Sequence, residues 1–178
     1  MNNEEQIEIP LSKTKMMLSF FGSLIFAVLG IWFIINPPKS NHFLFGNPIV
    51  IFIAGIASLI FFGIIAIIIF RKFSDKKPGL IINRNGIIDN SSGVSAGIIP
   101  WSDILEISIA QVMSQKFLMI IVKNPKEYLN KVKSPIKRNT MKMNYKTYGS
   151  PISISANSLA TDFDDLYILI SEKLSEYK

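Results

Sequence analysis

The chain has 178 residues, 49% of them hydrophobic, and its 19 Lys and Arg against 13 Asp and Glu give a net charge of +6. It contains no cysteine, which excludes disulfides, thiolate metal sites and cysteine nucleophiles. The length allows one modest domain beside membrane segments, and the frequent Ile, Lys and Asn are typical of an AT-rich bacterial genome.

Two long apolar runs lie before residue 71. Met16–Ile35 has 20 residues without a charge, and Ile49–Phe70 has 16 Ile, Leu, Phe or Val among its 22 residues. Either run can cross a hydrocarbon core of about 30 Å as a helix. An acidic N-terminus without a following cleavage site argues against a secretory signal. We therefore predict two retained transmembrane helices, with no ionisable residue that would suit a channel or a pump.

The connection between the two runs, Asn36–Pro48, carries the signals of a short loop. Pro37 and Pro38 should end the first helix, and Asn47 with Pro48 should cap and begin the second. The loop holds the single histidine, His42, which is therefore expected on the far side of the membrane from the soluble domain.

The basic residues that flank the spans predict their orientation. Lys39 is the only basic residue of the loop. Six basic residues lie just outside the two spans, namely Lys13, Lys15, Arg71, Lys72, Lys76 and Lys77. The positive-inside bias therefore places both termini in the cytoplasm, and the protein in the bacterial inner membrane.

Small residues recur along both spans at helical spacing. They are Ser19, Ser23 and Ala27 in the first span, and Ala54, Gly55, Ser58 and Gly63 in the second. Such stripes let helices approach closely. They predict packing of the two spans against each other, with a homo-oligomer interface as the alternative.

A basic linker, residues 71–78, leads to a domain over residues 79–178 whose first part reads as strands. Leu80–Asn83 and Ile87–Asn90 are too short to span a bilayer, and Asn85-Gly86 between them favours the positive φ angles of a tight hairpin. The Gly- and Ser-rich stretch Asn90–Gly97 is interpreted as a loop, because no lysine follows it as in a phosphate-binding loop. Trp101 is expected in the core.

The strand pattern continues beyond Trp101. Leu105, Ile107 and Ile109 alternate with polar or small residues, as in a half-buried strand, and residues 117–122 form a continuous run that suits a strand buried on both faces.

The end of the chain predicts one more strand and a closing helix. Ile152 and Ile154 alternate with serines, and an apolar stripe from Phe163 to Tyr177 predicts an amphipathic helix with Thr161 as N-cap.

The chain resembles an uncharacterised family of small bacterial two-span membrane proteins that carry a pleckstrin-homology-like C-terminal domain. The residues that carry the resemblance read EIPLSKTK from Glu8, GIIDNSSGVSAGIIPWSDI from Gly86 and YGSPISISANSL from Tyr148. The resemblance implies an α+β membrane protein, in which a transmembrane hairpin precedes a small antiparallel β domain closed by the C-terminal helix. Eukaryotic lipid-binding members of this fold place several basic residues around the first hairpin. Here Arg84 stands alone, so phosphoinositide recognition is not predicted.

One segment supplies the whole net charge. Residues 123–146 hold eight basic residues and one acidic residue, a balance of +7, and the rest of the chain carries eleven basic and twelve acidic residues. Pro135 would divide any helix in it, and the segment is interpreted as an insertion between strands. We predict that lipids or a partner bind at Lys126, Lys131, Lys133, Lys137, Arg138 and Lys142. The alternatives are a solvated face without a ligand and a protein partner; nucleic acid is not expected, because no binding motif accompanies the charge.

These residues suggest a function without catalysis. We identify no catalytic set, no metal site and no cofactor motif, since His42 is isolated and the Asp162, Asp164 and Asp165 cluster suits the start of a helix. We expect a binding or scaffolding module at the inner leaflet, whose partners are membrane lipids, a protein or a second copy. A rival expectation is an immunity protein that neutralises a membrane-acting toxin.

Overall fold

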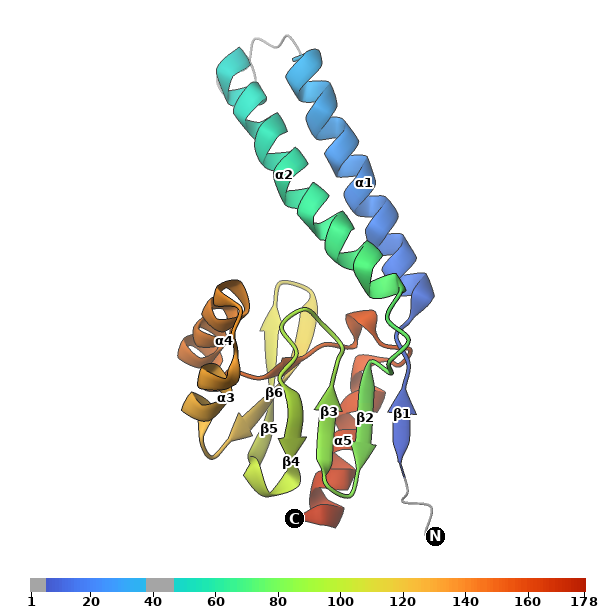
Figure 1. Cartoon of the computed structure of the whole chain (residues 1–178), viewed down its shortest axis with the longest axis vertical. Coiled ribbons are helices and arrows are strands. Elements are labelled where there is room, and N and C mark those ends of the chain that lie inside the picture. The colour runs from blue at the N-terminus through green and yellow to red at the C-terminus, as the bar shows by residue number, and fades with distance from the viewer. Residues whose placement is uncertain (1–5, 38–46) are drawn as a thin grey trace. The chain divides into compact units, whose positions relative to one another are not determined.

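The structure, a computed structural model, describes residues 6–37 and 47–178 (Figure 1). The chain forms two compact units. Lys13–Lys76 form a helical hairpin, whereas Met1–Ser12 and Lys77–Lys178 together form what we call the folded unit. Lys39 and His42, on which part of the sequence interpretation depends, lie outside the described residues.

The helical hairpin consists of α1, Lys13–Ile35, and α2, Pro48–Phe73. The predicted start of the second helix is confirmed, because Asn47 is its N-cap and the Asn47 Oδ1 accepts a 3.0 Å hydrogen bond from the Ile49 N–H. Pro48 occupies the first turn, where its missing N–H costs nothing. Both helices are long and apolar enough to cross a membrane.

Small residues form the contact between α1 and α2. Gly30 and Gly55 meet backbone to backbone, since a Cβ added to either would lie 2.8 Å from the carbonyl oxygen of the other. The Ser58 Oγ donates a 2.9 Å hydrogen bond to the Phe26 carbonyl oxygen across the same contact. Packing of the two helices against each other is thus confirmed. Gly22 and Gly63 have open space around them.

Most other side chains of the hairpin are exposed. Leu18 is 78% exposed and Ile49 68% exposed, and only 17% of the most apolar window of each helix is buried. The core helix of a soluble protein would be mostly buried. This exposed apolar surface is compatible with helices that cross a membrane.

Two antiparallel sheets make up the folded unit (Figure 1). The first has the order β1-β2-β3-β4, with β1 Ile7–Ile9, β2 Leu80–Asn83, β3 Gly86–Asp89 and β4 Gly97–Pro100. The second has the order β5-β6-β7, with β5 Ile104–Val112, β6 Gln115–Val122 and β7 Ser153–Ile154. The helices are α3 Pro125–Lys131, α4 Pro135–Tyr148 and α5 Phe163–Tyr177, with short 3-10 helices at Trp101–Asp103 and Ala156–Ser158.

The first strand of the folded unit comes from the segment before α1, which our sequence analysis did not predict to be structured. Ile9 pairs with Leu80, and its side chain is only 7% exposed. Leu11 then forms a bridge with Leu159. The two apolar helices therefore interrupt a single sheet.

The β2–β3 hairpin is present as predicted, and Gly86 has a positive φ of 150°. No residue of the turn before it has a positive φ: among the described residues Met113 is the only non-glycine with one. Asn83 instead supports the turn, because its Oδ1 accepts a 2.9 Å hydrogen bond from the Asn85 N–H. Glycine is required at Gly86 by close packing, since a Cβ there would lie 2.2 Å from the carbonyl oxygen of Ile99.

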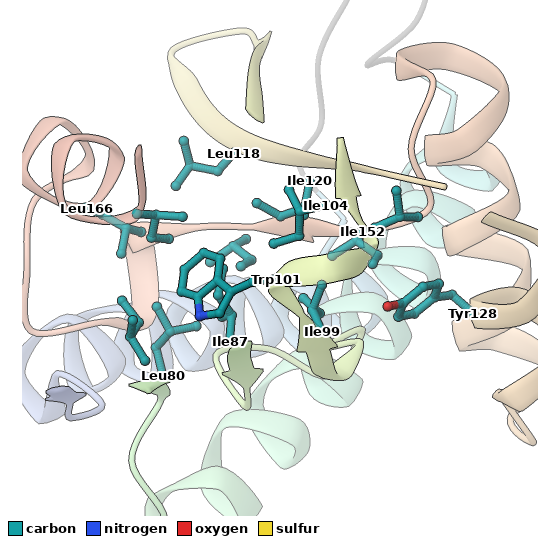
Figure 2. Close-up of a cluster of buried hydrophobic side chains, with 14 of the residues drawn as sticks. Leu80, Ile87, Ile99, Trp101, Ile104, Leu118, Ile120, Tyr128, Ile152 and Leu166 are labelled. Carbon is teal, nitrogen blue, oxygen red and sulfur yellow. The ribbon is translucent and has the colours of Figure 1, made fainter. Parts of the chain in front are cut away.

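Side chains from both sheets and from α5 share one core, shown in Figure 2. Trp101 lies within it at 3% exposure, and its Nε1–H donates a 2.8 Å hydrogen bond to the Asn83 carbonyl oxygen. Leu166 and Ile170 of α5 are fully buried against the core, as the apolar stripe predicts. The expected N-cap is wrong by one residue: Asp162, not Thr161, precedes α5.

In β5 the pattern of buried and exposed residues differs from the alternation predicted from the sequence. Leu105 is 47% exposed and Ile109 is 52% exposed, whereas Ile104 and Ala110 are buried. The register shifts between Ile104 and Glu106, so a bulge breaks the two-residue period. The prediction for β6 is confirmed, because three consecutive residues, Leu118 to Ile120, are buried.

Candidate functional site

The basic segment folds as two helices, α3 and α4, between β6 and β7. Pro135 stands in the first turn of α4 and Pro125 in that of α3, the position that proline favours. Gly149 ends α4 with a φ of 78°, and its N–H donates a 3.1 Å bond to the Tyr145 carbonyl oxygen. Met141, which is fully buried, holds α4 on the folded unit.

Tyr128 anchors α3. Its side chain is 3% exposed, and its hydroxyl donates a 2.9 Å hydrogen bond to Asp103 Oδ2 at the start of β5. Figure 2 shows the hydroxyl pointing from the helix toward the core cluster. Burial, followed by the neighbouring Asp103 carboxylate, raises the pKa of Tyr128 well above its usual value. The Lys131 Nζ lies 5.3 Å from the centroid of the Tyr128 ring, a distance at which a cation is attracted to the ring face.

Three of the six predicted residues line one cleft at the junction of α3 and α4, which we call the lysine cleft. Lys131 ends α3, Lys133 lies in the link between the helices, and Lys137 lies in the first turns of α4. The cleft has a volume of about 290 Å³, and Ala96, Ile98, Tyr128, Val132 and Ser134 complete its lining. Residues spread over 7 positions of the sequence thus converge on one small concave surface.

The other three predicted residues lie outside this cleft. The Arg138 Nη2 donates a 3.1 Å hydrogen bond to Asn130 Oδ1 and so links α4 to α3. Lys142 follows Arg138 by four residues, which puts both on one side of α4. Lys126 is exposed near the start of α3. The six residues are therefore divided between the lysine cleft and exposed positions on α3 and α4.

None of the six side chains has a carboxylate within 4 Å in the part of the chain that the structure describes. Like charges four residues apart on a helix, such as Arg138 and Lys142, cost roughly 0.2–0.5 kcal/mol per pair. The two helices thus concentrate positive charge, with Glu127 as the only acidic residue of α3 and α4. An anionic partner would relieve that repulsion.

Asp89, which sequence analysis did not single out, is a buried carboxyl group that interacts electrostatically with Lys137. It is 3% exposed, and it accepts hydrogen bonds from the Ser91 N–H, the Ser91 hydroxyl and the Ala96 N–H. Burial raises the pKa of Asp89, although these bonds and the charge of Lys137 act to lower it. Asp89 thus holds the Gly- and Ser-rich loop in place, and Ala96 of this loop lines the lysine cleft.

The charged groups of the lysine cleft favour an anionic ligand. They are ammonium groups, which donate up to three hydrogen bonds each and accept none. In the described residues, no group of three or more His, Cys, Asp or Glu could hold a metal ion.

Comparison of the chain with protein-family models, with curated proteins and with solved structures gives no match. The site must therefore be interpreted from its own residues.

Proposed function

We propose that this protein is an integral protein of the bacterial inner membrane, with both termini in the cytoplasm, whose pleckstrin-homology-like folded unit is a non-enzymatic binding module at the inner leaflet. The α3–α4 surface binds anionic lipid head groups through the lysine cleft and the basic residues around it. A protein partner of the same module would be held next to the membrane.

The pairing of β1 with β2 supports the orientation. Pro10–Ser12 link β1 to α1, and Ser74–Gly79 link α2 to β2, so both ends of the helical hairpin must lie on the same side of any membrane that it spans. The positive-inside bias of the flanking residues selects the cytoplasmic side.

The succession of elements supports the pleckstrin-homology-like assignment. Antiparallel strands follow one another from β2 to β6, β7 comes after the α3–α4 insertion, and one amphipathic helix, α5, closes the fold and packs into the core. This is the layout on which the resemblance rests.

The observation that carries the proposal is that Lys131, Lys133 and Lys137 line one cleft, and that none of them forms an ion pair with a carboxylate in the described part of the chain. Basic residues close to an anionic leaflet contribute about 1 kcal/mol each to attraction, and the effect decays over a screening length of about 8 Å at physiological salt. The tether of residues 74–79 keeps the folded unit near the bilayer.

Hydrogen exchange of the full chain in nanodiscs tests the proposal. The isolated segment 79–178 is unsuitable, because it lacks β1 and with it the buried Ile9. Amides of residues 125–148 should exchange more slowly in nanodiscs that contain phosphatidylglycerol than in phosphatidylcholine alone. The difference should shrink at 0.5 M salt, where screening is stronger.

A charge-matched pair of variants separates this site from general electrostatics. Neutralising Lys131, Lys133 and Lys137 to Gln should remove the phosphatidylglycerol-dependent protection. Neutralising Arg84, Lys116 and Lys178 to Gln, which removes the same charge elsewhere in the folded unit, should leave it. Equal protection in the parent and in the first variant would show that the lysine cleft does not bind head groups.

A further inference from the structure

A second cleft, which we call the apolar cleft, lies on the other part of α4. It has a volume of about 430 Å³, within the range of about 300–1,000 Å³ that is typical of small-molecule sites. Its walls come from α4, from the loop that Asp89 fixes, and from the sheet β5-β6-β7. The apolar lining includes Val94, Val112, Phe117, Met119, Met143 and Tyr148.

The apolar cleft stays open because small residues form its floor. Ala110 of β5 and Ser153 of β7 lie where larger side chains would fill the space. The Asn144 Nδ2 donates a 3.1 Å hydrogen bond to Ser153 Oγ, which holds α4 at a fixed separation from the sheet. Met143 is 63% exposed at the rim. No charged side chain lines this cleft in the part of the chain that the structure describes.

The two clefts adjoin along α4 and along one loop. Lys137 lines the lysine cleft and Thr140 lines the apolar cleft, and residues three apart on a helix are neighbours on the same side. Val94 and Ala96 of the fixed loop likewise belong to one cleft each. The lysine cleft thus lies about one helical turn, roughly 5 Å, from the apolar cleft along α4.

This combination selects the chemistry of the occupant. An inorganic anion would leave the apolar cleft empty, and a neutral hydrocarbon would leave the three ammonium groups unmatched. At about 30 Å³ for each water-sized group, the apolar cleft has room for about 14 such groups. That is the size of one hydrocarbon chain rather than two.

We propose that the apolar cleft binds the acyl chain of a single-chain anionic lipid, whose head group the lysine cleft holds. The inference rests on the proposed function, because it uses the same lysines for the head group. It goes beyond that function by making the folded unit a receptor for one lipid molecule rather than a surface attracted to many. Each methylene buried in the cleft should tighten binding about fourfold.

Photo-crosslinking of the full chain tests this. The protein is placed in phosphatidylcholine nanodiscs that contain lysophosphatidic acid with a diazirine near the end of its chain, irradiated, digested and analysed by mass spectrometry. Labels should occur on cleft residues such as Phe117 and Met119. Labels on α1 and α2, whose exposed apolar side chains face lipid in any case, serve as the internal standard.

Two variants that block the cleft make the test specific. Ala110→Phe fills the floor, and Met143→Trp covers the rim from an exposed position that leaves the core unchanged. Each should lower cleft labelling about tenfold relative to α1 and α2. The control Ile168→Trp changes a residue that is 53% exposed on α5 and outside the cleft, and it should change nothing. Unchanged labelling in both blocking variants, or no cleft labelling in the parent, overturns the inference.

A neutral probe tests the head group. A monoacylglycerol with the same diazirine chain should label the cleft at least tenfold less than the anionic probe, and the Lys131, Lys133 and Lys137 to Gln variant should remove that difference. Equal labelling by the two probes overturns the assignment of an anionic lipid. If the cleft is not labelled but phosphatidylglycerol still slows hydrogen exchange of residues 125–148, only the acyl-chain site is refuted. If neither effect is observed, the proposed function is refuted as well.

Discussion

Tyr128 in α3 donates a hydrogen bond to Asp103 at the start of β5, with 2.9 Å between the Tyr128 Oη and Asp103 Oδ2. The bond joins the helix that carries Lys131 to the core of the folded unit, because Tyr128 is buried and Asp103 lies between the buried Trp101 and the buried Ile104. The position of the lysine cleft depends on this anchor.

Replacing Tyr128 with Phe should therefore destabilise the folded unit by about 1–2 kcal/mol, since it removes a hydrogen bond to a charged group while keeping the ring. The pKa of Tyr128 is raised, so the bond's contribution is fully present below the unfolded value of about 10 and is lost as the pH rises through the folded pKa. Denaturant unfolding followed by Trp fluorescence should show that Tyr128→Phe has a clearly lower free energy of unfolding than the parent at pH 8. The difference should be smaller above pH 10. A deficit that is constant across this range would contradict the assigned ionisation.

The buried Asp89 carboxyl should make the stability of the folded unit depend on pH in the acidic range. Its pKa is raised from 3.8, so the protonated carboxyl favours folding and this contribution disappears as the pH rises through the folded pKa. Relative to Asp89→Asn, whose side chain does not ionise, the parent should be more stable near pH 4 than near pH 7. Denaturation curves of the two proteins at both pH values give their free energies of unfolding. Subtracting the two values at each pH removes the contributions of the other acidic residues, which both proteins share. The opposite trend would show that hydrogen bonds from Ser91 and Ala96 outweigh burial.

The contact of Gly30 with Gly55 should make the helical hairpin sensitive to a single methyl group. Gly30→Ala places a Cβ 2.8 Å from the Gly55 carbonyl oxygen, and overpacking of this kind costs about 1–3 kcal/mol. Gly22→Ala is the matched control, because a Cβ there meets nothing within 4 Å. When the protein is unfolded in mixed micelles by increasing SDS, the SDS content at the midpoint of unfolding should be lower for Gly30→Ala than for the parent. It should be unchanged for Gly22→Ala. A similar midpoint for both variants would contradict the close approach of the two helices.

The predicted orientation can be measured with single cysteines, because the natural chain has none. Ser40→Cys lies in the loop between the spans and should react with an impermeant maleimide on intact spheroplasts. Ser175→Cys, exposed on α5, should react only after the membrane is opened. Labelling of both cysteines from the same side would refute the two-span hairpin.

Ile9 tests whether the segment before α1 belongs to the folded unit. Ile9→Ala should cost about 3 kcal/mol, as expected for a buried Ile shortened to Ala. Glu8→Ala, at the exposed neighbouring position of the same strand, should stay within about 0.5 kcal/mol of the parent. Thermal unfolding of the full chain in detergent, followed by Trp fluorescence, compares the two. Equal stability of both variants would exclude β1 from the core.

The sequence predicted the elements that depend on long or strongly patterned runs. The two apolar helices, the β2–β3 hairpin, the buried β6 strand and the amphipathic α5 each show their period or length within one segment. Asn47 and Pro48 similarly marked the start of α2 through local geometry alone. Membrane insertion and the pleckstrin-homology-like fold stay predictions.

The elements that were missed depend on distant partners. The three residues of β1 become a strand only through pairing with β2, on the far side of both apolar helices. The bulge near Leu105 reverses the buried face of β5 without any glycine or proline to mark it. The sequence indicated that residues 123–146 are basic, but not that Lys131, Lys133 and Lys137 share a cleft, because its other walls come from residues 96–98.

The interruption of one sheet by the helical hairpin sets an order for biosynthesis. Leu80 is translated about 70 residues after Ile9, which at 5–20 residues per second is a delay of about 4–14 s. Throughout that time β1 has no partner strand, while α1 and α2 become available to the insertion machinery. On the proposed topology, β2 can pair with β1 only after the helical hairpin has brought the chain back to the side of the membrane on which β1 lies. On the proposed two-span topology, a failure of insertion would therefore leave an unpaired strand edge and an incomplete core in the same molecule, so folding of the sheet would depend on insertion of the hairpin.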